Sequence, residues 1–82
     1  MCFTYILYSL KLDKYYTGYS CDDLHKRIAK HNSNHKGFTG GKGDWKLVYK
    51  EEYLSKKDAI EREREIKKKK SRKYIEYLIS EK

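Results

Sequence analysis

The stretch KYYTGYS, Lys14 to Ser20, sets three tyrosines around one glycine, and it decides the fold. Tyrosine suits a β-strand because its flat ring fits a pleated surface. In a strand, Tyr16 and Gly18 share one face, while Tyr15 and Tyr19 share the other. We therefore predict a strand over these residues with phenol rings on both faces, and the two faces need separate explanations.

The segment TYILY, Thr4 to Tyr8, is a second tyrosine-bearing strand just upstream. A short polar turn around Lys11 to Asp13 separates the two segments, and this spacing predicts a β-hairpin. After the hairpin, Asp22 or Asp23 is expected to cap a helix formed by LHKRIAKHN.

The rest of the chain adds one strand and two helices. Residues 33–44 hold four of the five glycines and predict a loop, and KLVYKEEY, residues 46–53, predicts a third strand. Ser55 with Asp58 resembles a capping box, so a helix should run from there to about Lys69. Ser71 should cap a last helix. The buried side of that last helix is expected to hold Tyr74, Ile75 and Leu78.

The element order is thus ββαβαα. It predicts an α/β fold in which a small three-stranded sheet is flanked by helices. With 82 residues there is room for a single domain, 1–82.

The net charge of +8, from 20 Lys and Arg against 12 Asp and Glu, favours a polyanionic partner. The other interpretation is a soluble protein with a solvated basic surface. No apolar run approaches the length of about 18 residues needed to span a membrane, and we expect no membrane partner. MCFTYILYSL is not typical of a signal peptide, so a cytoplasmic location is expected, with Cys2 and Cys21 as reduced thiols.

Three polar side chains fall on the apolar faces of the predicted helices. On a helical wheel His31 lies within about 20° of Leu24, and Arg27 lies about 60° to one side. Glu63 lies within about 40° of Ala59, near the middle of the apolar face of the next helix. Inward charges need partners, so either they form a site or Glu63 makes a salt bridge to Arg27.

This inward set suits phosphodiester hydrolysis. Arginine supplies a fork for charged phosphate oxygens, and glutamate supplies a metal ligand. Tyrosine or histidine can move a proton, but a free tyrosine is a poor base with a pKa near 10. To act as a base, a tyrosine here would need the nearby cations to lower that pKa.

The sequence resembles the GIY-YIG nuclease family, and five segments carry the resemblance in order. They are FTYIL at Phe3 to Leu7, YTG at Tyr16 to Gly18, DLHKRIAKHN at Asp23 to Asn32, LVYKEEY at Leu47 to Tyr53 and AIEREREIKK at Ala59 to Lys68. The likeness covers nearly the whole chain. It is greatest to small stand-alone bacterial members, and more distant relatives include the N-terminal nuclease domain of an excision-repair protein.

The resemblance implies a catalytic residue at each matching position. These residues are Tyr5, Tyr16, Arg27, His31 and Glu63, with Glu63 as the metal ligand. The first tripeptide departs from the family pattern because Phe3 replaces its glycine. The loop has Lys42 where relatives often carry more arginines, which leaves the substrate preference open.

The function implied is a metal-dependent DNA endonuclease with one Mg²⁺ or Mn²⁺ ion, acting in DNA repair or processing. DNA would be held through its phosphate backbone, and Lys42 and the run Lys67, Lys68, Lys69 and Lys70 are candidate contacts. That lysine run is otherwise a solvated helix end. Two alternatives remain: a nucleic-acid-binding module that cuts poorly, and a subunit whose protein partner supplies specificity.

Overall fold

The computed structural model describes residues 1–32 and 44–81. It contains β1 (Cys2–Ser9), β2 (Lys14–Ser20), α1 (Leu24–Asn32), β3 (Trp45–Tyr53), α2 (Lys56–Lys69) and α3 (Arg72–Ser80). The predicted order ββαβαα and the α/β fold class are confirmed. Strands β1 and β3 each extend slightly beyond their predicted bounds, and Lys42 lies outside the described residues.

The sheet is antiparallel, with the order β2-β1-β3. The hairpin register sets Tyr5 opposite Gly18 and Leu7 opposite Tyr16. The turn between β1 and β2 contains Asp13, which has a positive φ of 51°. Asp44 also holds this region, because its carboxylate accepts hydrogen bonds from the Ser9 hydroxyl and the Lys11 backbone N–H.

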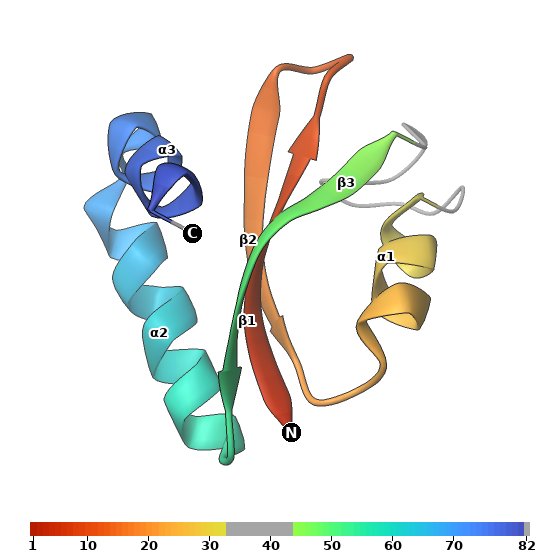
Figure 1. Ribbon diagram of the computed structural model, residues 1–82, viewed down its shortest axis with the longest axis vertical. Coiled ribbons are helices and arrows are strands. Elements are labelled where there is room, and N and C mark those ends of the chain that lie inside the picture. The colour runs from red at the N-terminus through yellow and green to blue at the C-terminus, as the bar shows by residue number, and fades with distance from the viewer. Residues whose placement is uncertain (33–43, 82) are drawn as a thin grey trace.

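The sheet lies between two helical layers, with α1 on one face and α2 and α3 on the other (Figure 1). On the α1 face, Tyr5, Leu7, Leu24 and Trp45 form the buried cluster. On the opposite face the cluster is Ile6, Ile66 and Leu78. Because side chains alternate along a strand, β1 supplies both cores and is the centre of the molecule.

Side-chain caps fix where the helices begin. The Asp23 carboxylate accepts from the His25 backbone N–H at 2.8 Å, which agrees with the predicted cap before α1. The Ser55 hydroxyl accepts from the Asp58 N–H, and the Ser71 hydroxyl accepts from the Tyr74 N–H, both at 3.1 Å. These caps were predicted, and they orient α2 and α3 against the sheet.

Cys2 and Cys21 form a disulfide, so the expectation of two reduced thiols is wrong for this structure. The hairpin register explains the pairing. Phe3 lies opposite Ser20, so the next residue outward on each chain segment brings the two cysteines together. No described helix is both long and apolar enough to cross a membrane.

Candidate active site

Tyr5 and Gly18 form the floor of the candidate site. The Tyr5 side chain is fully buried on the α1 face of the sheet. Gly18 is its cross-strand partner, and a Cβ atom at position 18 would lie 2.8 Å from the Tyr5 hydroxyl oxygen. The missing side chain therefore gives the Tyr5 ring room to lie across β2.

Helix α1 places two polar side chains at the Tyr5 hydroxyl. Arg27 and His31 are four residues apart, so they lie on the same face of the helix. Arg27 Nε donates to the Tyr5 oxygen at 3.4 Å, and the Tyr5 hydroxyl lies 3.0 Å from His31 Nε2. A guanidinium can only donate, so the phenol proton is available to His31 in the tautomer that carries its proton on Nδ1.

Tyr16 lies beside this cluster on the same face of the hairpin. Its ring centroid is 4.8 Å from the centroid of the His31 ring. Tyr5 and Tyr16, the two tyrosines at the family's signature positions, thus both contact His31. Tyr15, on the opposite face, packs against the α2–α3 cluster and against the Tyr8 ring, with a centroid distance of 4.9 Å.

Glu63 approaches the tyrosines from α2. Its side chain is 15% exposed and lies 3.6 Å from the ammonium group of Lys67, which is half exposed. The Lys67 ammonium is also 5.6 Å from the centroid of the Tyr16 ring. Because β2 is an edge strand, side chains from α2 can reach around it to the α1 face. The structure pairs Glu63 with Lys67 rather than with Arg27.

The pKa of Tyr5 is shifted mainly by its burial. Burial raises its pKa above 10.0, and the hydrogen bond and charge of Arg27 only partly offset that effect. Glu63 raises the pKa slightly further, which shows that its charge acts on the phenol. Arg27 does lower this pKa, as a tyrosine base would need, but removal from water outweighs Arg27 and the net shift is upward. The hydrogen bond to Tyr5 raises the pKa of Arg27, which stays charged.

The four lysines at the end of α2, residues 67–70, differ in what they contact. Lys67 lies at the candidate site, and Lys67 and Lys70 line a pocket between β2 and the α2–α3 corner. Lys69 lies over the Tyr74 ring at 5.3 Å from its centroid. Lys68 is exposed. The run is therefore more than a uniform solvated helix end.

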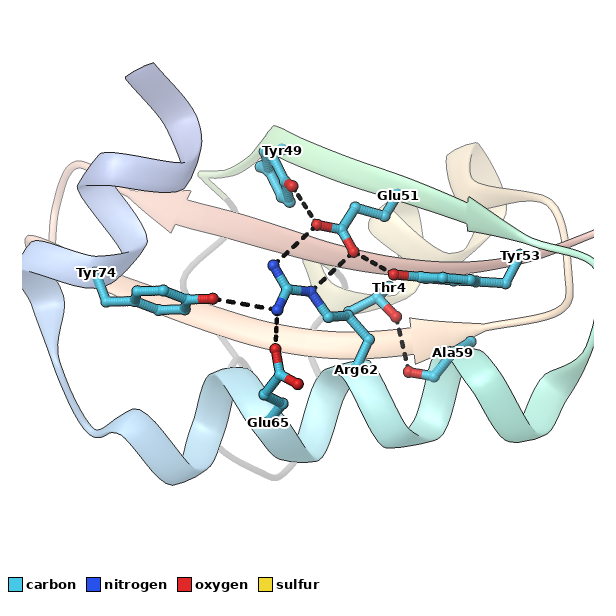
Figure 2. A network of polar contacts seen from close by, with 8 residues as sticks. All are labelled: Thr4, Tyr49, Glu51, Tyr53, Ala59, Arg62, Glu65 and Tyr74. Atoms are coloured by element: carbon cyan, nitrogen blue, oxygen red, sulfur yellow. Dashed lines mark hydrogen bonds and ion pairs between the residues drawn. The ribbon is translucent and has the colours of Figure 1, made fainter. Parts of the chain in front are cut away.

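A second polar network, which the sequence analysis missed, lies on the other face of the sheet (Figure 2). Arg62 donates from Nε to the Glu51 carboxylate at 2.9 Å, and the hydroxyls of Tyr49 and Tyr53 donate to the same carboxylate. Arg62 also bonds to Glu65 and to the Tyr74 hydroxyl. The sequence does indicate this position. Arg62 follows Ala59 by three residues and precedes Ile66 by four, so a helical wheel places it next to the apolar face of α2.

The Glu51–Arg62 network joins β3, α2 and α3 on the face away from Tyr5. Burial opposes ionisation of Glu51, but hydrogen bonds from Arg62, Tyr49 and Tyr53 lower its pKa. The same network raises the pKa of Tyr49 and of Tyr53 to about 12, through burial and the Glu51 charge. Its contacts join α2 to β3 and to α3.

Among residues 1–32 and 44–81, no three His, Cys, Asp or Glu side chains gather as a metal cluster. Glu63 is thus a single carboxylate paired with Lys67, and its charge also acts on the Tyr5 phenol that contacts Arg27 and His31. This donor set is typical of a site that binds a charged phosphate together with an ion.

The fold is a small α/β domain with helices on both faces of a three-stranded sheet (Figure 1). Comparison with known proteins gives the family. A family model described as the GIY-YIG catalytic domain matches residues 1–75. The chain therefore belongs to the GIY-YIG family, a nuclease superfamily whose members are generally endonucleases and typically depend on a divalent metal.

Relatives of similar size carry the name UPF0213 protein. The chain is 46% identical over 54 residues to UPF0213 proteins from two strains of Staphylococcus epidermidis. The match covers 63% of this chain and 63% of each relative's length. The solution NMR structure of a UPF0213 protein from Bacillus halodurans has a TM-score of 0.60 and 37% identity, covering 100% of this chain and 86% of that one.

Proposed function

We propose that this protein is a metal-dependent endonuclease that hydrolyses phosphodiester bonds in DNA, in repair or another processing step. The observation that supports this most strongly is the contact series from Arg27 through the Tyr5 hydroxyl to His31. These contacts bring Arg27, as the cation that binds phosphate, next to Tyr5 and His31, as the pair that passes a proton.

Glu63 fits the role of ligand for a single Mg²⁺ or Mn²⁺ ion. Mg²⁺ sites often use one or two protein carboxylates, with water and substrate phosphates completing the coordination. The present partner of Glu63 is a half-exposed lysine at 3.6 Å, which a divalent ion can displace. When bound, the ion would stabilise negative charge on the scissile phosphate.

Proton transfer follows from the raised pKa of Tyr5. At neutral pH the phenol keeps its proton, so Tyr5 acts as a relay. Its oxygen accepts a proton from the attacking water while its own proton passes to His31 Nε2. The water oxygen forms a bond to phosphorus, the bond to the leaving oxygen breaks, and that oxygen takes a proton from solvent.

Arg27 serves both the relay and the substrate. A guanidinium has five N–H donors, so it can hold the Tyr5 oxygen and still donate to a phosphate oxygen. Tyr16 packs on the His31 ring and helps to fix its orientation. The function of these residues in one reaction is our proposal.

The same pKa shift also favours the second candidate function, a nucleic-acid-binding module that cuts poorly. A phenol that resists ionisation is a weak proton acceptor unless the relay operates. A partner-dependent subunit would show the same behaviour when tested alone.

A cleavage panel separates the candidates. Single-stranded, duplex, flap and branched DNA would be incubated with Mg²⁺, Mn²⁺ or EDTA, using the wild type and Glu63→Gln. We expect metal-dependent cleavage that falls by a factor on the order of 10² or more in Glu63→Gln. The fold should persist, because Lys67, the ion-pair partner, is half exposed. Full activity in Glu63→Gln would contradict the metal assignment, and DNA binding without cleavage would favour the binding module.

A further inference from the structure

A pocket next to the candidate site has a composition of its own. It has a volume of about 540 Å³ and lies between β2 and the corner where α2 meets α3. Ligand sites are typically about 300 to 1,000 Å³, so the pocket can take a group the size of a nucleotide. Tyr16 and Lys67 line its near end, and both also border the candidate active site.

The inner surface of the pocket is apolar. Ile66, which is 2% exposed, and Ile75 belong to the core cluster beneath it. Tyr15 completes this surface and is held on two sides. The Arg72 guanidinium lies 5.1 Å from its ring centroid, and the Tyr8 ring lies 4.9 Å away. The Tyr15 ring is therefore held in place before any ligand binds.

The rim of the pocket is basic. Its cations are Lys14, Lys67, Lys70 and Arg72, and its carboxylate is Asp13. Asp13 already accepts hydrogen bonds from Arg72 at 2.6 Å and from the Tyr8 hydroxyl at 2.6 Å. A ligand would thus meet an excess of positive charge around an apolar and aromatic floor.

We propose that this pocket binds one unstacked nucleotide of the substrate strand, next to the nucleotide that is cut. This proposal rests on the proposed function, because it takes the scissile phosphate to lie at the candidate active site, beside the pocket. The base would pack on Ile66, Ile75 and the Tyr15 edge, and its phosphate would meet the lysine rim. Bases in a duplex are covered by stacking, whereas an unstacked base offers a flat face to an apolar wall.

The first test measures binding without metal, so that no cleavage is needed. A single-stranded trinucleotide, the same trinucleotide with an abasic central position, and inorganic phosphate would be titrated while methyl NMR shifts are recorded. We expect the Ile66 and Ile75 methyls to shift with the trinucleotide alone. Leu54, an exposed residue just before α2 and at the end of that helix away from the pocket, supplies the control methyls.

The second test uses the backbone conformation of Lys70, at the corner where α2 meets α3. Lys70 has a left-handed conformation with a φ of 48°, which glycine adopts more readily. Lys70→Gly should therefore keep or raise the melting temperature while weakening trinucleotide binding by roughly threefold to tenfold, as for one lost phosphate contact. Lys57→Ala removes the same charge from an exposed position at the other end of α2, outside the pocket, and should change binding less than about twofold.

Three results would overturn the proposal: no shift at Ile66 and Ile75, equal shifts with the abasic trinucleotide or phosphate, or equal weakening by Lys57→Ala and Lys70→Gly. Each can occur whether or not the protein cleaves DNA. A failed cleavage panel with intact pocket binding would instead count against the proposed function alone.

Discussion

Gly18 lies directly opposite Tyr5 in the β1–β2 ladder, and a Cβ atom at Gly18 would come within 2.8 Å of the Tyr5 hydroxyl oxygen. Real Cβ atoms essentially never approach so closely, and the Tyr5 ring is enclosed by the core, so it cannot simply rotate away. The absence of one side chain thus fixes the position of the hydroxyl that contacts Arg27 and His31.

Gly18→Ala should therefore damage the site more than the fold. The new methyl group would displace the Tyr5 hydroxyl and lengthen its contacts to Arg27 and His31. We expect kcat/KM for DNA cleavage to fall about tenfold or more, because small misplacements of reacting groups are costly. The overpacking itself should cost about 1 to 3 kcal/mol of unfolding free energy. Both are measurable, by cleavage kinetics and by denaturant unfolding.

Thr4→Ser is the matched control for Gly18→Ala. Thr4 is the fully buried neighbour of Tyr5 on β1, and its hydroxyl donates to the Ala59 backbone oxygen on the other face of the sheet. It should lower stability without changing the cleavage rate of the folded protein. A Gly18→Ala protein with normal kcat/KM would show that the hydroxyl position does not matter.

Tyr5→Phe tests the relay directly. It keeps the ring volume and removes the hydroxyl, so His31 Nε2 and Arg27 Nε both lose a partner. We expect cleavage to fall by a factor on the order of 10² or more, as for other lost proton-transfer groups. Tyr16→Phe should also lower the rate, if its hydroxyl takes part in orienting water or phosphate.

Tyr19→Phe is the control, because Tyr19 lies on the opposite face of β2 and does not line the nucleotide pocket. Thermal melts would show whether each variant folds. Equal and small rate effects at Tyr5, Tyr16 and Tyr19 would mean that the tyrosines are structural.

The placement of the candidate residues could be predicted from the sequence because it depends on two short periods. The period of two residues put Gly18 and Tyr16 on one face of β2, and the helical period put Arg27 and His31 together. Tyr5 was named through the family resemblance, and the hairpin register sets it opposite Gly18. The sign of the Tyr5 pKa shift could not be predicted, since it depends on how far three separate segments bury the phenol. The disulfide was also missed, because compartment was used as the guide and the register was not extended to Cys2 and Cys21.

The Glu51–Arg62 network predicts how stability depends on pH. The pKa of Glu51 is lowered in the folded protein from 4.5, so its contribution is fully present above about pH 4.5. It is lost as the pH falls through the lower, folded value. Glu51→Gln should cost about 1 to 3 kcal/mol at pH 7, because Arg62 loses its anionic partner. It should also flatten the acid side of the stability curve, measured by urea unfolding between pH 3 and 7.

Glu52→Gln is the control for Glu51→Gln. Glu52 is the next residue on β3, its side chain is half exposed, and its ion pair with Lys50 is long at 4.0 Å. Removing its charge should leave stability within about 0.5 kcal/mol. If Glu51→Gln and Glu52→Gln had the same acid dependence, the network would not be the source of the pH effect.

The Cys2–Cys21 disulfide predicts a stability that depends on reductant. The bond joins residues 19 apart, across the open end of the hairpin and just before α1. In the chain-entropy view a loop of this size contributes up to about 3 kcal/mol, and less here because the strands already hold the ends together. Dithiothreitol should therefore lower the melting temperature of the wild type. It should leave the Cys2→Ser, Cys21→Ser double variant unchanged. Thiol labelling of the unreduced, denatured protein should find no free cysteine, and two reactive thiols in that assay would contradict the assignment.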